Sequence, residues 1–470
     1  MSLNQVSNQH LLFKSHLEDC IKMRTVFQGD KAIKANAKTY VPKNKGVSDD
    51  DYNAIIQRSV FENFTEATAK GISGLIFAKE PTVSVPTSLE ILKDNIDMDD
   101  NTIVDLSQNI VNELMEVGRC GLLIDVPNID TTGMTKPQTD ALNIRAFMKL
   151  YKSETIINWR YESINSVNKL TLLVLHEVYE DWTDRFTAKL KDRYRVYSLI
   201  DNVCYVEVFE ESDKSFINTM DMKPVIVKGS TINYIPFIPL TYKDISIVPT
   251  KPPLMDIADI NINYYGVAVE RRNVIHFVGN PFFMGKGINT RDDKGNALTI
   301  TLGSSIAQIF QEVNADMKIV ETQGTGLAFN ESYLNDCKVT MAALGARLLV
   351  DDAKAQISEN TMQMKTAGYR ATIMQIANTA SRAITQALKI IAEWEGTSEQ
   401  EVKDIKAQLN TDYNLSEMDA QTITALVTAW QTGAIRKEDM FLKFQKGEIV
   451  ESGISFEDFN ANLEVTAPTL

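Results

Sequence analysis

The hydrophobic pattern of this chain is dominated by one long helical repeat in its C-terminal half. It extends from about Ile357 to Glu395, and Gly396 follows as a residue suited to end a helix. At 1.5 Å per residue such a helix spans roughly 58 Å, which is longer than a small domain is wide. We expect its buried face to carry residues that are apolar or small, namely Ala367, Ala371, Met374, Ala377, Ile384, Leu388 and Ile391.

A shorter helix is predicted just before the long one, from Glu331 to Leu349, with Asn330 as its N-cap. A short polar break separates the two helices. The long helix has no sustained 3.5-residue heptad, and charges such as Lys365 and Arg370 exclude a membrane span. We therefore interpret the long helix as a strut that belongs to an assembly of subunits.

The N-terminal part of the chain shows helical spacing in three segments, Leu11–Met23, Asp51–Phe77 and Thr102–Val117. Ser48 and the three aspartates Asp49–Asp51 stand just before the second segment. Adjacent carboxylates could suggest a metal site, but they also suit the positive end of a helix dipole beside a serine N-cap. We interpret them as a helix start.

A strand pattern follows these helices. The run Gly121–Pro127 predicts a short buried strand after a helix stop at Gly118. Between residues 143 and 250, β-branched and aromatic residues alternate with polar ones and turns fall at hairpin intervals, which predicts a small antiparallel β unit. His176 lies in this unit as an isolated histidine, so we assign it a structural role. The clearest strand patterns are Thr171–Leu175, Tyr194–Tyr197, Cys204–Phe209 and Ile235–Pro239.

Helical spacing returns after Pro252-Pro253, where a helix is predicted from Leu254 to Phe277. Residues 278–329 are glycine-rich and resemble a compact insertion between two helices, with strands suggested at Leu298–Leu302 and Met317–Glu321. Beyond Gly396 the chain is again helical. Its predicted starts and helices are the capping box Ser398–Glu401, a similar start at Ser416–Asp419 that leads to Trp430 and Gly433, and helices at Arg436–Gln445 and Phe456–Leu463. The expected fold class is α+β, mainly helical.

Composition narrows the class of protein. With 470 residues, 44% apolar and 23% charged, the chain has room for two to four folded units. No N-terminal apolar segment suggests a signal peptide, and no window suggests a membrane span. Four scattered cysteines predict reduced, structural thiols. The formal charge of −14 argues against a protein that grips nucleic acid over a large surface.

Motifs for catalysis are missing. The segment Gly279–Gly287 superficially resembles a phosphate-binding loop, but the spacing of its glycines is wrong and Gly287 replaces the Ser or Thr that binds magnesium. The sequence contains none of the usual metalloprotease, hydrolase or Cys/His ligand motifs, and its four histidines are dispersed. We expect no enzyme activity, no cofactor and no metal, although a two-carboxylate nuclease site would not be visible from one sequence.

Four motifs together resemble those of a known family, the portal proteins of tailed bacteriophages, in the branch formerly catalogued as a phage domain of unknown function. The similarity covers residues 50–400 and rests on the order and spacing of soft motifs. It is weakest in the polar break, where the sequence departs from the usual pattern. The motifs are Tyr52 with Arg58–Phe61 and Gly71–Phe77 leading to Pro81, then Gly118–Pro127, then Pro253–Asn261 with Tyr264 and Tyr265, and Met341–Leu349.

The resemblance implies a ring, typically of twelve subunits, at one vertex of the capsid, where DNA is packaged and ejected. It implies a wing at residues 1–250, stem helices at 251–277 and 330–349, a clip at 278–329, a tunnel loop at 350–356, a long helix at 357–396 and a helical crown at 397–470. It also implies two groups of residues along the DNA channel. The tunnel-loop group is Asp351, Asp352, Lys354 and Gln356, and the stem group near the channel is Arg271, Arg272 and Arg347.

The partners implied by the resemblance are other copies of the chain, double-stranded DNA in the channel, the large subunit of the terminase, the capsid or scaffold protein and the head–tail adaptor. The expected location is the virion, after assembly in the cytoplasm of the host bacterium. The negative charge suits a conduit, because a basic lumen would hold the duplex through released counterions. Two alternatives remain: another structural virion protein, such as a scaffold or adaptor, and a packaging nuclease or ATPase.

Overall fold

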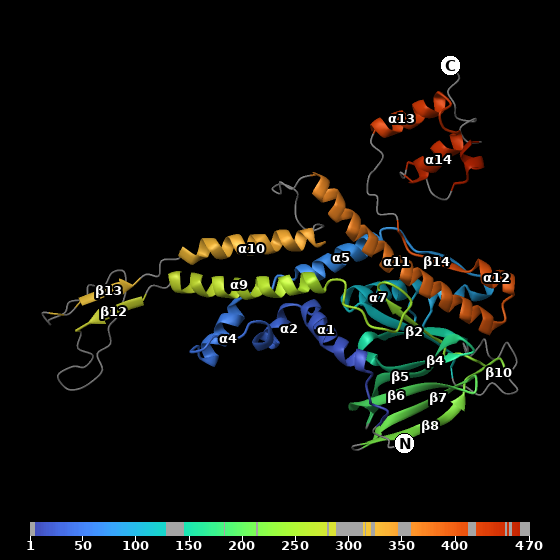
Figure 1. Ribbon diagram of the computed structural model, residues 1–470, viewed down its shortest axis with the longest axis horizontal. Coiled ribbons are helices and arrows are strands. Elements are labelled where there is room, and N and C mark those ends of the chain that lie inside the picture. The colour runs from blue at the N-terminus through green and yellow to red at the C-terminus, as the bar shows by residue number, and fades with distance from the viewer. Residues whose placement is uncertain are drawn as a thin grey trace. The chain divides into compact units, whose positions relative to one another are not determined.

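The structure is a computed structural model that describes residues 5–127, 145–182, 184–212, 215–279, 282–287, 314, 316–320, 325–345, 359–411, 420–446, 449–450 and 454–460 (Figure 1). The chain divides into two compact units, Met1–Thr411 and Asp412–Leu470. Helices and strands are mixed and helix predominates, so the expected combination of α and β structure is confirmed.

The N-terminal part is helical, as the sequence predicts, but the expected helix over residues 51–77 is wrong because it is two helices. Ser59 has an extended backbone, and Asn63 accepts a hydrogen bond from the Glu66 backbone N–H and so caps a new helix. The break places Phe61, 4% exposed, into the core against Tyr265. The helices are α1 (Leu11–Phe27), α2 (Asp30–Ala35), α3 (Ala37–Tyr40), α4 (Asp49–Arg58), α5 (Phe64–Ile76), α6 (Ile91–Asp94) and α7 (Ile103–Glu116), with a 3-10 turn η2 (Thr87–Leu89).

Two of the predicted helix boundaries are confirmed by their caps. Ser48 accepts a hydrogen bond from the Asp51 backbone N–H, so the aspartate run does begin a helix, α4. Thr102 and Asp105 form a capping box at the start of α7. Gly118 then ends α7 with a φ of +76°, a conformation that glycine adopts without strain.

A three-stranded antiparallel sheet with the order β11-β2-β3 follows α7. Its central strand is the predicted buried strand, and Gly121 in it faces Phe237 so closely that an added Cβ would lie 2.1 Å from the ring. The absence of a side chain at Gly121 therefore leaves room for the Phe237 ring against β2. The strands are β2 (Arg119–Asp125), β3 (Phe147–Lys152) and β11 (Phe237–Thr241).

The expected antiparallel β unit is confirmed as a five-stranded meander with the order β4-β5-β6-β7-β8 (Figure 1). Its core includes Trp159, Leu173 and Tyr197. His176 has the expected structural setting, since its Nε2 lies 2.8 Å from Asp192 Oδ1 on the neighbouring strand. The strands are β4 (Ile156–Ile164), β5 (Val167–Trp182), β6 (Ala188–Ile200), β7 (Val203–Ser212) and β8 (Ser215–Pro224), with a short pair β9 (Ile226–Val227) and β10 (Ser230–Thr231) beyond them and the turn η3 (Ser153–Thr155) before β4.

The helix predicted after Pro252-Pro253 is present as α9 (Met255–Gly279). Its partner α10 spans Thr325–Ala343, so the predicted start and the predicted N-cap Asn330 are wrong, and Asn330 lies inside the helix. The predicted end is also wrong, because Gly345 takes a φ of +125° and stops the helical backbone. α10 packs against α9, a contact that the sequence pattern does not reveal.

Between α9 and α10 the structure describes one antiparallel strand pair, β12 (Phe282–Lys286) with β13 (Asp316–Val320). The strand expected at Met317–Glu321 is therefore confirmed. The strand expected at Leu298–Leu302 lies outside the described residues. Strand β12 covers most of the segment 279–287 that superficially resembles a phosphate-binding loop.

The long helix is confirmed as α11 (Glu359–Glu395) and ends in a Schellman motif. Gly396 has a φ of +73° and donates to Glu393 O at 3.1 Å, while Thr397 donates to Ala392 O at 2.9 Å. The predicted face is correct at Ala377, Ile384, Leu388 and Ile391, but Met374 is 40% exposed, because the buried row runs through Ile373 and Ile376 instead. The buried row also includes small residues, namely Ala380, Ala383, Ala387 and Ala392.

The segment after Gly396 begins with the predicted capping box, in which Ser398 caps α12 (Glu399–Asp404). The strand β14 (Lys406–Gln408) follows, and it pairs with β1 (Thr82–Ser84). The boundary between the two compact units falls after Thr411, so α12 and β14 belong to the first unit.

The second unit is helical in the part that the structure describes, as expected. It contains α13 (Ala420–Gln431), followed by Gly433 with a φ of +76°, and α14 (Lys437–Lys446). Phe441 on α14 packs against Phe456 and Phe459. The expected helix start at Ser416 lies outside the described residues.

Candidate functional site

The first candidate for a functional site is the helix pair α9–α10 with its base. The resemblance to portal proteins implies that this pair is the stem. The pair is antiparallel and lies side by side (Figure 1). Asn263 on α9 donates a side-chain hydrogen bond of 2.8 Å to the Tyr333 hydroxyl on α10. Arg271 on α9 lies 3.6 Å from the Glu331 carboxylate on α10. These polar side-chain contacts link the two helices.

The base of α9 is fixed to α5 by a buried asparagine. Asn261 is fully buried, and its Oδ1 accepts hydrogen bonds of 3.1 Å from both the backbone N–H and the hydroxyl of Thr65. Its Nδ2 donates to Glu62 O at 2.8 Å. Because these polar groups at the start of α5 are satisfied by one side chain of α9, the asparagine specifies how the two helices cross.

Lys338 adds a cationic contact to the same region. Its ammonium lies 5.5 Å from the centre of the Phe64 ring and 5.4 Å from that of Tyr264, and 3.5 Å from a Glu62 oxygen. Burial opposes the charge of Lys338, but contacts with Tyr264 and Glu62 outweigh it and raise the pKa. Lys338 thus ties α10 to the α5–α9 junction.

The predicted channel residues are only partly within the described structure. Arg271 is half-buried and forms the ion pair with Glu331, so its charge is balanced within the chain. Arg272 is exposed and lines a cleft with Arg58 of α4. The tunnel-loop residues Asp351, Asp352, Lys354 and Gln356, together with Arg347, lie outside the described residues.

The long helix α11 is anchored to the rest of its unit by side-chain hydroxyls. Ser381 Oγ accepts a hydrogen bond of 2.9 Å from the Leu409 backbone N–H. Thr385 Oγ1 accepts one of 2.9 Å from the Ala407 N–H and donates one of 3.1 Å to the Ala407 carbonyl. Near its C-terminus, Trp394 donates to the Tyr234 hydroxyl at 3.0 Å. The small-residue face of α11 is therefore buried within its own chain, against α7, β2, β11 and β14.

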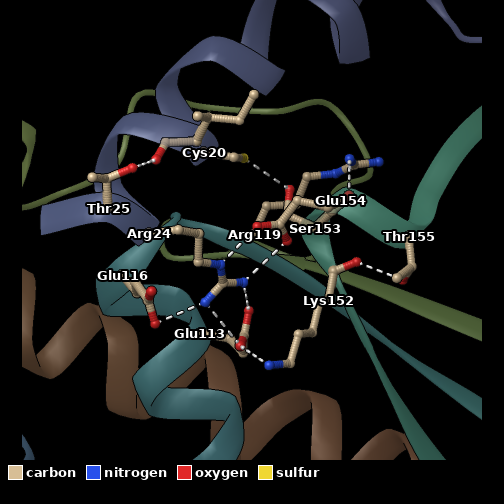
Figure 2. Close-up of polar contacts among 11 residues, drawn as sticks. Cys20, Arg24, Thr25, Glu113, Glu116, Arg119, Lys152, Ser153, Glu154 and Thr155 are labelled. Atoms are coloured by element: carbon tan, nitrogen blue, oxygen red, sulfur yellow. Dashed lines mark hydrogen bonds and ion pairs between the residues drawn. The ribbon is translucent and has the colours of Figure 1, made fainter. Parts of the chain in front are cut away.

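A second candidate is the ionic cluster around Arg24, which sequence reasoning missed (Figure 2). The Arg24 guanidinium lies 2.6 Å from Glu113, 2.7 Å from Glu116 and 2.6 Å from Glu154. Lys152 reaches Glu113 at 3.6 Å. The cluster joins α1 to α7 and η3, and all three carboxylates are mostly buried.

The pKa directions in this cluster follow from burial and charge. Burial opposes the charge of Arg24, but hydrogen bonds to Glu154 and Glu113 outweigh it and raise its pKa. For Glu154, burial favours the protonated form, yet bonding to Arg24 lowers the pKa. Burial raises the pKa of Glu116 despite its contact with Arg24. One cation thus compensates several carboxylates unequally, which is the pattern of a structural clamp.

Arg119 is a buried cation next to this cluster. It is fully buried, its guanidinium lies 4.7 Å from the Trp159 ring centre, and its Nη1 donates weakly to the Ser153 and Ile156 carbonyls at 3.4 Å. Burial lowers its pKa to about 10. No hydrogen-bond partner for its Nε or Nη2 occurs among the described residues. The sequence signal that could have pointed to this buried cation is an arginine between two glycines at the start of an apolar strand.

Clusters of metal-ligating side chains and the thiols are the remaining candidate groups. No group of three His, Cys, Asp or Glu side chains there could hold a metal ion. The four cysteines are buried and free, and burial raises the pKa of the Cys20 and Cys204 thiols to about 12, which makes them poor nucleophiles. Among the described residues, no helix is long and apolar enough to cross a membrane.

Comparison with known proteins adds one finding. A family model described as "Domain of unknown function (DUF4055)" matches residues 253–395, the stretch that contains α9, β12, β13, α10 and α11. No curated protein matches the chain. The chain is therefore similar, over the helix pair, its insertion and the long helix, to a family whose description gives no function.

Proposed function

We propose that this chain is the subunit of a phage portal, a ring through which DNA enters and leaves the capsid. The observation that carries the proposal is the antiparallel pair α9–α10 with the strand pair β12–β13 between the two helices in sequence. A long helix, α11, follows this unit. This order of elements suits the stem, clip and wing helix of a portal.

The polar links along α9–α10 support this role. A stem must transmit the position of the clip to the wing without bending, and paired helices joined by side-chain contacts resist bending better than a single helix. Asn263 and Arg271 place such contacts between α9 and α10, and Asn261 fixes the base of α9 to the start of α5. We assign Arg272 and Arg347 to the stem as well, and Asp351, Asp352, Lys354 and Gln356 to a loop in the channel.

The net charge of −14 supports passage rather than binding of DNA. Each phosphate that a protein neutralises releases counterions and strengthens binding, so a basic channel would slow the duplex. A ring multiplies the charge of one subunit around its axis, and the narrow channel focuses the resulting field. The proposed partners are further copies of the chain, the terminase large subunit at the clip, the capsid or scaffold protein, and the head–tail adaptor.

Light scattering on the purified chain tests the proposal. A closed ring follows from a heterologous interface whose rotation closes. The expected mass is roughly twelve times the 52.7 kDa of one chain, and it should not grow with concentration, as it would for an open filament. A stable monomer at micromolar concentration and physiological salt would count against the portal role.

A further inference from the structure

A cleft of about 210 Å³ lies between the end of α4 and the outer half of α9. It is lined by Ile55, Arg58, Arg272, Asn273, Ile275 and His276. None of the residues that we assigned to the ionic cluster or to the α9–α10 contacts lines this cleft, so it is a separate feature of the surface.

The two arginines of this cleft are unusual for an acidic chain. Neither Arg58 nor Arg272 forms an ion pair or a hydrogen bond among the residues that the structure describes, although acidic residues outnumber basic ones. The neighbouring Arg271, in contrast, turns to Glu331 on α10. Two uncompensated guanidiniums on one small cleft create a local positive potential that a bound anion would neutralise.

The arrangement of donors indicates the kind of anion. Arg58 comes from α4, while Arg272 and Asn273 come from α9, so N–H donors reach the cleft from two walls. Each guanidinium can donate two parallel hydrogen bonds to one oxyanion. A planar carboxylate has two oxygens and is matched by a single fork, whereas a phosphate group offers oxygens in several directions. Donors on both walls therefore suit a tetrahedral group better.

We propose that the Arg58–Arg272 cleft is a binding site for a phosphate group. Arg58 and Arg272 hold its oxygens from opposite walls, Asn273 contributes an amide donor, and the apolar side chains Ile55 and Ile275 border the site and limit its solvation. Free inorganic phosphate and the phosphodiester of a nucleic acid offer this same chemistry. The proposal does not rest on the portal role, because a single chain contains the whole cleft.

Calorimetric titration of the full-length protein with inorganic phosphate, against sodium chloride at matched ionic strength, tests the site. We expect saturable binding that weakens by roughly tenfold in each of the variants Arg58→Gln and Arg272→Gln, since each removes charge-assisted hydrogen bonds. The matched control is Arg160→Gln, which removes the same charge from an exposed pair with Glu162 on β4 and should leave binding unchanged. The three variants and the native protein should share one melting temperature within error, because these arginines are exposed.

Further arms of the titration identify the source of the phosphate. Displacement of phosphate by a short DNA duplex would assign the site to a phosphodiester, and failure of the duplex to compete would assign it to free phosphate. Three results would overturn the proposal: no heat beyond that of chloride, equal weakening by Arg160→Gln, or binding of free glutamate as tightly as phosphate. The last result would indicate that an acidic protein segment occupies the cleft.

Discussion

Asn261 on α9 accepts two hydrogen bonds from Thr65 on α5, one from the backbone N–H and one from the hydroxyl, each 3.1 Å long. The two residues are far apart in sequence, and both are fully buried. This relationship ties the first turn of α5, which Asn63 caps, to the base of the α9–α10 pair.

Replacement of Asn261 by alanine should therefore be costly. It leaves the Thr65 backbone N–H and hydroxyl without a partner in a buried site, and each unsatisfied group costs about 1–3 kcal/mol. We expect the free energy of unfolding in urea to fall by at least about 2 kcal/mol. Asn263→Ala, which removes an exposed bond to Tyr333, is the control and should cost less than about 1 kcal/mol. Equal effects would show that Asn261 does not organise the junction.

Arg24 should be the critical member of the ionic cluster. Arg24→Ala leaves Glu113, Glu116 and Glu154 mostly buried without their shared cation, and breaking a buried pair in this way destabilises a protein by about 3–5 kcal/mol. The control is Arg160→Ala, whose exposed pair should contribute at most about 1 kcal/mol. Urea unfolding of both variants measures the difference, and a loss below about 1 kcal/mol for Arg24→Ala would contradict a clamp.

His16 should make stability fall in mild acid. Burial, and then the charge of Arg119, lowers the pKa of His16 in the folded state. The unfolded chain, with an ordinary pKa near 6.5, then binds the proton more readily, so the contribution of His16 is complete above about pH 6.5 and is lost as the pH falls through the folded-state value. One such group changes the unfolding free energy by at most about 1.4 kcal/mol per pH unit.

This pH dependence is tested by the slope of the unfolding free energy against pH, not by its absolute value. His16→Gln should flatten the fall in unfolding free energy as the pH drops below about 6.5. Burial and Arg119 also lower the pKa of the less buried His10, so His10→Gln should flatten the curve in the same sense but less. An unchanged slope in His16→Gln would show that another group is responsible.

Local signals explain which parts of the fold could be predicted from the sequence. Gly396 and Ser398 were recognisable because a helix stop and a capping box depend on a few adjacent residues, and both are present. The start of α10 and the exposure of Met374 were not, because packing against a distant helix or sheet decides them. The pairing of β14 with β1 joins segments more than 300 residues apart in sequence, and no local pattern reveals it.

The candidate sites show the same division. The two adjacent positive charges of Arg271 and Arg272 were visible in the sequence, but their different contacts were not. Arg271 forms an ion pair with Glu331 on α10, whereas Arg272 lines the cleft with Arg58. The Arg24 cluster was missed because its carboxylates come from α7 and η3, far along the chain. Spatial convergence of ordinary charged residues leaves no motif in one sequence.

The proposed channel loop leads to a prediction about DNA packaging. Replacing Asp351 and Asp352 by lysine should turn a repulsive ring of charges into an attractive one that holds DNA, in a manner that weakens steeply with salt. We expect intact assembly but impaired packaging in a complementation assay, whereas replacement by asparagine should change stability by less than about 0.5 kcal/mol. Normal packaging by the lysine variant would show that the segment does not face DNA, and loss of assembly would place it in an interface between subunits.

Electron microscopy of the purified chain, with class averaging of single particles, tests the central claim most directly. A portal subunit should give end-on views of a closed ring with a central hole, with a single rotational symmetry close to twelvefold. The Asn261→Ala variant should give fewer rings, because the base of the α9–α10 pair is loosened. Particles without a hole, open filaments or isolated monomers under conditions where the chain is folded would contradict the portal role.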